Sequence, residues 1–247
     1  MKPRVLAIAA HPDDIEIGMA GTLLRLADAG WELHYFNVSC GNGGSAELDG
    51  EAVAAVRLEE AREGAARLGA HFYPPVARDL EIVYSVELLR KVAAVVREVN
   101  PEVVLTHALA DYMEDHMETA RLAVTAAFAK RVPNFASDPA RPGAAGEVVV
   151  YHAMPHGGRG PLREVVEPDL YVDISGVMER KRRALEAHQS QQGWLDQTQG
   201  MSSYVQAMVE SGMALGARSG RGGAAEGWRR HLALGLAAEE RDPLAEL

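Results

Sequence analysis

Short apolar runs and longer amphipathic segments alternate along most of the chain. The apolar runs predict strands over Val5–Ala9, Leu33–Val38, Val103–Thr106, Val148–Tyr151 and Leu170–Ile174. The segments between them place apolar residues at helical spacing and predict helices over Ile15–Ala29, Val53–Leu68, Val86–Val99 and His116–Phe128. Such alternation is typical of a mostly parallel sheet with helices on both faces, so we predict a Rossmann-like α/β fold.

The pattern changes near residue 176 and becomes mainly helical. It predicts helices over Val177–Gln191 and Ser203–Leu215, followed by the glycine-rich stretch Gly216–Gly223 and a last amphipathic piece. The sequence contains no internal repeat and no linker long enough to separate two domains. We therefore expect residues 1–247 to form a single domain in which residues 176–247 are a mostly helical extension.

Composition and charge narrow the range of partners. The net charge is −10 and the longest basic run is Arg180–Arg183, so we expect neither nucleic acid nor an anionic membrane as a partner. No apolar stretch approaches the roughly 20 residues of a spanning helix. A single cysteine, Cys40, and an N-terminus without a secretory cleavage pattern predict a cytoplasmic protein. A small molecule is the expected partner, and the prediction allows for a homo-oligomer.

Candidate chemistry appears where the first predicted strand ends, at His11-Pro12-Asp13-Asp14. In α/β sheets, ligands bind outside the carboxyl ends of the strands. One imidazole and two carboxylates at this place can supply two metal ligands and a base. The alternative is an ordinary helix start in which Asp13 or Asp14 is the N-cap, but capping accounts for only one of the two carboxylates.

A second group of the same residue types follows the strand that ends at Thr106-His107, in the segment from Asp111 to His116. Three protein ligands and an open position are typical of a catalytic metal site. His11, Asp14 and one histidine of this region would form such a set, which suits Zn²⁺ and also Fe(II). Spacing alone leaves the choice between His107 and His116 open. Asp115 either caps the helix or orients a ligand imidazole.

Five sequence motifs together resemble the LmbE-like (PIG-L) family of metal-dependent N-acetylglucosaminyl deacetylases. They are Ala10–Gly18 with Gly21-Thr22, Arg57–Glu60 with Leu68-Gly69, Asp111–His116, Lys181 with His188–Gln191, and Ala225–Trp228. The correspondence runs in order along nearly the whole chain. It implies a Rossmann-like sheet and an amino-sugar conjugate as the small-molecule substrate.

The resemblance also implies roles for single residues. It implies a zinc ion held by His11, Asp14 and His116, with Asp13 as the general base and Asp115 as a supporting carboxylate. Zinc brings the pKa of a water molecule towards about 7, so that Asp13 can take a proton as the water attacks an acetamide. Arg57 matches the arginine of the family and is expected to hold the substrate or the oxyanion.

The chain departs from the family at Met113, where many members have a histidine that polarises the carbonyl or carries a proton. Methionine can do neither. Among the histidines near the next strand end, His156 is the candidate to replace it, and the alternative is that His156 is an ordinary surface residue. His188 lies in a helical pattern, where a structural role is an equal alternative.

Other functions are compatible with the same residues. The departure at Met113 leaves open a metal-dependent hydrolase of another amide or carbon–nitrogen bond. A non-catalytic, metal-containing sugar binder is a further alternative, although it would have no use for Asp13. The glycines Gly41, Gly43 and Gly44 match the dinucleotide fingerprint only in part and do not follow the first strand, so we interpret them as a close backbone approach to the metal site.

Overall fold

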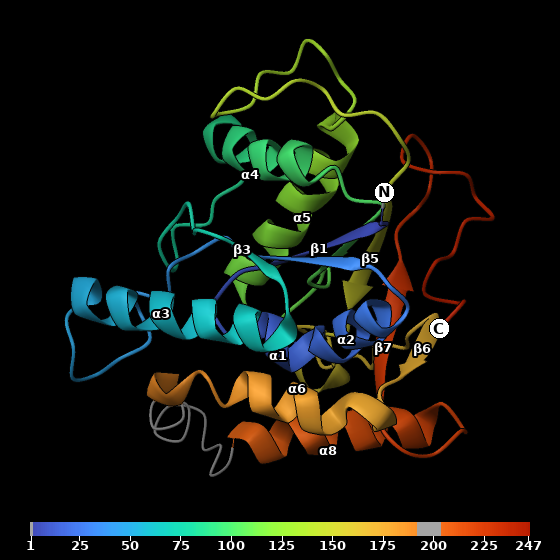
Figure 1. Cartoon of the computed structure of the whole chain (residues 1–247). Helices are drawn as coiled ribbons and strands as arrows, with labels where there is room; N and C mark the ends of the chain where they lie inside the picture. Colours follow the sequence, from blue (N-terminus) through green and yellow to red (C-terminus); the bar gives the residue numbers. More distant parts are fainter. Residues whose placement is uncertain (1, 192–203) are drawn as a thin grey trace.

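A twisted sheet runs through the middle of the molecule (Figure 1). The computed structural model describes residues 2–191 and 204–247. In these residues the strands are β1 (Arg4–Ala9), β2 (Glu32–Asn37), β3 (His71–Tyr73), β4 (Val103–Thr106), β5 (Val149–Ala153), β6 (Leu170–Asp173) and β7 (Ala225–Arg230). They form one seven-stranded sheet in the order β3-β2-β1-β4-β5-β7-β6. The pairs from β3 to β5 are parallel, and β7 is antiparallel to both of its neighbours.

Helices cover both faces of this sheet. They are α1 (Asp14–Gly18), α2 (Ala20–Asp28), α3 (Gly50–Leu68), α4 (Val86–Val99), α5 (Glu114–Ala129), α6 (Met178–Leu185) and α8 (Tyr204–Arg218), with short 3₁₀ turns η1 (His156–Gly158) and η2 (Ser175–Val177). Figure 1 shows α4 and α5 on one face and the other helices on the opposite face. The predicted Rossmann-like, mostly parallel α/β fold is therefore confirmed.

The side chains of the central strand β1 alternate between two apolar cores, one on each face of the sheet. Val5 and Ala7 belong to the apolar core beneath α2 and α3, whereas Leu6 and Ile8 belong to the core beneath α4 and α5. Successive side chains of a strand point to opposite faces, so a continuous apolar run is what a strand buried on both faces requires. Within residues 2–191 and 204–247, no helix is long and apolar enough to cross a membrane.

The predicted helix over Ile15–Ala29 is wrong in one respect, because the chain breaks at Met19 between α1 and α2. The break exposes the backbone N–H groups at the start of α2 to a carboxylate from far along the chain. The Glu226 side chain accepts hydrogen bonds from Gly21 N at 2.8 Å and from Thr22 N at 2.7 Å. A tertiary cap of this kind leaves no mark in local periodicity.

The mostly helical interpretation of residues 176–247 also needs correction. The last amphipathic piece contains β7, which lies inside the sheet between β5 and β6. Its residue Glu226 is buried and pairs with the equally buried Lys181 at 2.6 Å, and Trp228 donates to the Thr22 hydroxyl at 2.8 Å. A strand with a buried ion pair and an internal glycine lacks the apolar pattern from which strands are predicted.

Smaller differences concern element ends. The prediction missed the short edge strand β3, and α6 ends at Leu185 rather than at Gln191. Ser203, the predicted first residue of the following helix, lies outside the described residues, and α8 continues to Arg218. Gly69 ends α3 with a φ of +73°, as its position predicted, because glycine adopts this left-handed conformation without strain.

Candidate metal centre and active site

The two predicted groups of chemistry-bearing residues meet at one edge of the sheet. His11 follows β1, and His116 lies in the first turn of α5 after the neighbouring strand β4. The sheet order makes this the point where the chain reverses direction across the sheet, with β2 on one side of β1 and β4 on the other. Crevices at such switch points are the usual ligand sites of α/β sheets.

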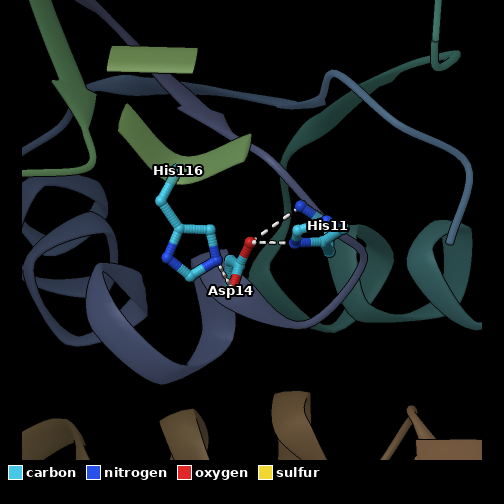
Figure 2. A group of neighbouring side chains, drawn as sticks. All are labelled: His11, Asp14 and His116. Carbon is cyan, nitrogen blue, oxygen red and sulfur yellow. Dashed lines mark hydrogen bonds and ion pairs between the residues drawn. The ribbon is translucent and has the colours of Figure 1, made fainter. Parts of the chain in front are cut away.

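His11, Asp14 and His116 form a compact group of metal-ligand types. Figure 2 shows the Asp14 carboxylate between the two imidazole rings. Asp14 Oδ2 lies 3.3 Å from His11 Nδ1, and Asp14 Oδ1 lies 3.5 Å from His116 Nε2. The three side chains each offer one ligand atom within 4.8 Å of the others. Ligand atoms of a tetrahedral zinc site with bonds of about 2.0–2.1 Å are separated by about 3.3–3.5 Å, so these residues fit such an ion.

Carboxylates on the outer side fix both imidazoles. His11 Nε2 contacts Asp115 Oδ2 at 3.0 Å, and His116 Nδ1 contacts Asp111 Oδ1 at 3.1 Å. With a proton on each of these nitrogens, His11 Nδ1 and His116 Nε2 are left with lone pairs towards Asp14. This is the usual way in which a second carboxylate orients a metal-ligating histidine. Asp115 thus lies where the resemblance places a supporting carboxylate, whereas the role of Asp111 was missed.

The charges of the group also suit a cation. Burial raises the pKa of Asp14, but His116 and His107 outweigh this effect and hold it well below its ordinary value. Burial lowers the pKa of His11, but hydrogen bonds to Asp115 and Asp14 outweigh it and raise the pKa to about 10. The site therefore favours positive charge at its centre, and a divalent cation would take the place of the imidazole proton.

His107, Asp111 and His116 form a second group with ligand atoms within 4.8 Å of one another. The atoms of this group that could bind a metal mostly take part in hydrogen bonds within the protein. His107 Nε2 accepts a hydrogen bond from Ala10 N at 2.9 Å, and Asp111 is the partner of His116 Nδ1. The His107 ring stacks on the His116 ring with centroids 4.1 Å apart. These contacts favour a supporting role for His107 and His116 as the ligand.

Asp13 is buried between β1 and α1 in an unusual backbone conformation. Its φ is +108°, a value that costs a non-glycine residue of the order of 1–3 kcal/mol and often accompanies a functional site. Burial raises the pKa of its carboxyl, and the Arg57 guanidinium partly offsets this rise. Asp13 thus has the higher pKa and Asp14 the lower one, which is the division expected of a base beside a ligand.

Arg57 is buried beneath Asp13 rather than exposed on α3. Its Nη2 lies 3.3 Å from Asp13 Oδ2 and also donates to the Pro12 carbonyl, and its Nη1 donates to Gly41 O at 3.3 Å. These contacts support a role in holding Asp13. They leave the expected contact of Arg57 with substrate as a prediction.

The glycine-rich loop after β2 makes room for Arg57. A Cβ atom at Gly41 would lie 2.6 Å from Arg57 Cδ, and one at Gly44 would lie 2.8 Å from Arg57 Nη1. The Asp79 carboxylate, which the sequence analysis did not single out, holds the loop by accepting from Gly41 N at 2.8 Å and Gly43 N at 2.9 Å. The glycines were expected to approach the metal site; in the structure Gly41 and Gly44 approach Arg57, and Gly43 approaches Asp79.

A cavity of about 660 Å³ opens over these residues. Its lining includes His11, Asp13, Asp14, His116 and Arg57, together with Met113 and His156. His156 lies on η1 and is exposed, and its ring is 6.1 Å from the ring of Tyr112, which in turn is 5.5 Å from His116. The structure thus brings His156 to the same cavity as Met113.

His188 is placed away from this cavity lining. Its Nε2 lies 3.2 Å from Glu16 Oε1, and both side chains are fully buried. Glu16 also accepts a hydrogen bond from the Tyr35 hydroxyl at 3.1 Å. The contacts of His188 thus support the structural alternative, a link between α1 and the region after α6.

A buried histidine pair behind the site predicts acid sensitivity. His152 Nδ1 contacts the His107 carbonyl at 2.7 Å and its Nε2 contacts His231 Nδ1 at 2.9 Å. Burial lowers the pKa of His152 to about 4. Between pH 6.5 and 4 the unfolded chain takes up a proton that the folded chain does not, so stability falls as the pH falls, by about 1.4 kcal/mol per pH unit.

Denaturant unfolding at pH 7, 5.5 and 4.5 measures this effect. His152→Gln should lose less stability than the wild type over this range, by up to about 3 kcal/mol in total. His156→Gln, which replaces an exposed histidine, is the matched control and should follow the wild type. Parallel curves for wild type and His152→Gln would contradict the prediction.

Fold and site together define a Rossmann-like α/β protein with a His-Asp-His cluster at the switch point of its sheet. Residues 6–127 match the family model described as PIG-L: GlcNAc-PI de-N-acetylase. Diacetylchitobiose deacetylase of Thermococcus kodakarensis is 31% identical over 196 residues, which cover 76% of this chain and 70% of that protein. The chain therefore belongs to the PIG-L (LmbE-like) family, as its motifs predicted.

Two solved structures of similar proteins have different named activities, one a deacetylase and the other a hydratase. The structure of N,N'-diacetylchitobiose deacetylase from Pyrococcus horikoshii has a TM-score of 0.75 at 28% identity, covering 94% of this chain and 84% of that one. The structure of GalB, the 4-carboxy-2-hydroxymuconate hydratase from Pseudomonas putida KT2440, has a TM-score of 0.80 at 24% identity, covering 98% and 100%. The second likeness shows the shared fold alone.

Proposed function

We propose that this protein is a zinc-dependent hydrolase that removes the N-acetyl group from an N-acetylglucosamine-type sugar or conjugate. The observation that carries the proposal is the presence of a His-Asp-His group and a separate buried carboxylate, Asp13, in one cavity. A binder would need no base beside its ligand group. The deacetylases among the relatives support the acetamide as the bond that is broken.

The residues of the site would have different roles in hydrolysis. His11, Asp14 and His116 would hold the metal, which as a Lewis acid polarises a carbonyl and acidifies water; Fe(II) is the alternative ion for this donor set. Asp13 accepts the proton of the attacking water as the new carbon–oxygen bond forms. As the carbon–nitrogen bond breaks, Asp13 returns that proton to the nitrogen, and acetate and a free amine leave. Arg57 holds Asp13, while Asp115 and Asp111 hold the imidazoles.

The charges of the cavity favour a substrate without several carboxylates. Its described arginine and lysine residues are Arg57, Lys181 and Arg218, and each is paired, with Asp13, Glu226 and Glu167 respectively. Carboxylates are bound most strongly by charge-assisted hydrogen bonds from cations that have no other anionic partner. The described lining therefore fits an uncharged sugar better.

The far part of the cavity suits a group attached to the sugar. Met154 and Pro155 after β5 face the same space as Met208 and Leu215 of α8. A volume of about 660 Å³ is in the range of about 300–1,000 Å³ that holds a drug-sized ligand. We propose that an apolar group attached to the sugar lies there, since burial of apolar surface is favourable.

Acetate release tests the proposed function. Metal-loaded protein is incubated with N-acetylglucosamine, diacetylchitobiose, and phenyl and octyl N-acetylglucosaminides, and acetate and free amine are quantified. We expect turnover of at least one of these sugars, and a rate lower by a factor of about 10² to 10⁴ with Asp13→Asn. Folded, metal-loaded protein that releases no acetate from any of them, or that instead hydrates an unsaturated carboxylic acid, would overturn the proposal.

The replacement of the family histidine by Met113 gives a separate prediction. If His156 now supplies the donor near the developing oxyanion, His156→Ala should lower turnover about 100-fold, the effect of losing roughly 3 kcal/mol, and leave metal content unchanged. Met113→His in that variant should restore part of the rate. Unchanged turnover in His156→Ala would remove His156 from the mechanism, and exposed His71, replaced by alanine, is the control.

A further inference from the structure

Tyr204, the first residue of α8, brings a phenol into the cavity that holds Asp13. Its side chain lines the cavity, yet the residue is only 2% exposed. Its hydroxyl is buried and makes no hydrogen bond of ordinary geometry within residues 2–191 and 204–247. Buried hydroxyl groups nearly always have a partner, so this one needs an explanation.

The neighbour of this hydroxyl is the Asp13 carboxyl. Both side chains line the same cavity, and the hydroxyl lowers the pKa of the Asp13 carboxyl as a hydrogen-bond donor, against the larger, opposing effect of burial. Burial, and then the Asp13 charge, raise the pKa of Tyr204 well above its ordinary value. The phenol therefore keeps its proton at neutral pH and remains a hydrogen-bond donor.

The other buried hydroxyl nearby has a different partner. Tyr35 donates to Glu16 rather than to Asp13. Arg57, on α3, also contacts Asp13, because its Nη2 lies 3.3 Å from Asp13 Oδ2. A carboxylate held by one donor can pivot about that contact, whereas donors from two different elements fix its plane.

We propose that Tyr204 is a positioning residue for Asp13: its hydroxyl, together with Arg57, holds the carboxylate at the angle from which it accepts the proton of the attacking water. The inference rests on the proposed hydrolysis. It also gives α8 a role in the reaction, because the helix that forms one wall of the cavity carries an anchor of the base. The sequence gives no hint of this contact, since Tyr204 belongs to none of the family motifs.

A double-mutant cycle tests the proposal. Kinetics are measured for wild type, Tyr204→Phe, Asp13→Asn and the double variant, on the sugar that the wild type turns over best. Tyr204→Phe should lower kcat about 10- to 100-fold, as small misplacements of a reacting group do, with KM and metal content within about twofold of wild type. In the Asp13→Asn background the same change should have no further effect, because the group that it positions can no longer accept a proton.

Tyr151→Phe is the matched control. Tyr151 is fully buried, and its hydroxyl is 2.5 Å from Asp242 rather than near the cavity residues. This variant should lose thermal stability but keep the wild-type kcat, which separates loss of a buried hydroxyl from loss of positioning. Thermal unfolding of every variant shows whether it is folded at the assay temperature.

The outcomes are distinct. An unchanged kcat in Tyr204→Phe, or an equal fold-loss in the wild-type and Asp13→Asn backgrounds, overturns the role of Tyr204 alone. A wild type that releases acetate from no sugar overturns the proposed function and, with it, this role. A loss of kcat that disappears in the Asp13→Asn background supports the proposal.

Discussion

Replacing His116 by alanine is expected to abolish stoichiometric binding of a divalent metal while leaving the fold largely intact. The variant removes one of the three proposed ligand side chains and leaves the Asp111 carboxylate without its imidazole partner. Loss of a residue that merely orients a ligand already costs about 10- to 100-fold in metal affinity, so loss of the ligand should cost at least 100-fold. Elemental analysis after dialysis measures the metal, and circular dichroism confirms the fold.

Two further variants make this result specific. His11→Ala should lose metal as His116→Ala does, whereas His71→Ala, on the surface, should keep it. His107→Ala separates the two candidate ligand groups, because His107 belongs only to the second of them. Full metal content in His116→Ala would exclude His116 as a ligand. Loss of metal in His107→Ala with retention in His11→Ala would instead favour the second group.

Asp13→Asn is expected to retain the metal and to lose turnover by a factor of about 10² to 10⁴. Asparagine has the size of aspartate, and its amide oxygen can still accept a hydrogen bond from Arg57, but it cannot take a proton at neutral pH. Steady-state acetate release and metal analysis on the same preparation provide the two measurements.

The surface variant Asp28→Asn controls for loss of one carboxylate. Asp28 is exposed and pairs with Arg180 on the outside of the molecule, so its loss should leave turnover unchanged. Near-normal turnover of a good substrate by Asp13→Asn would remove Asp13 from the role of base. Loss of metal in that variant would show that Asp13 acts as a ligand.

The parts of the fold that sequence predicts well are those whose signal is local. Strands β1 and β4 are buried on both faces and are therefore continuous apolar runs. The strand β7 was missed because its buried Glu226 is made tolerable by Lys181, a partner distant in sequence. The break at Met19 was missed for the same reason, since the carboxylate that caps α2 comes from Glu226.

The candidate site likewise contains residues that the sequence predicts and residues that depend on tertiary packing. His11, Asp14 and His116 follow strand ends, and this placement together with the family motifs predicts that they meet. Asp111 could have been found, because it precedes His116 by five residues at the same strand end and carboxylates commonly orient ligand imidazoles. The burial of Arg57 beneath Asp13 and the approach of Tyr204 depend on how α3 and α8 pack against the sheet, which no local pattern contains.

The Glu226 cap also sets the order in which the molecule can be completed during synthesis. The amide groups of Gly21 and Thr22 leave the ribosome early, but the carboxylate that binds them follows 205 and 204 residues later. Until then Lys181 has no anionic partner in the interior and α2 has no cap at its start. The start of α2 can therefore complete its native hydrogen bonds only after β7 has been synthesised.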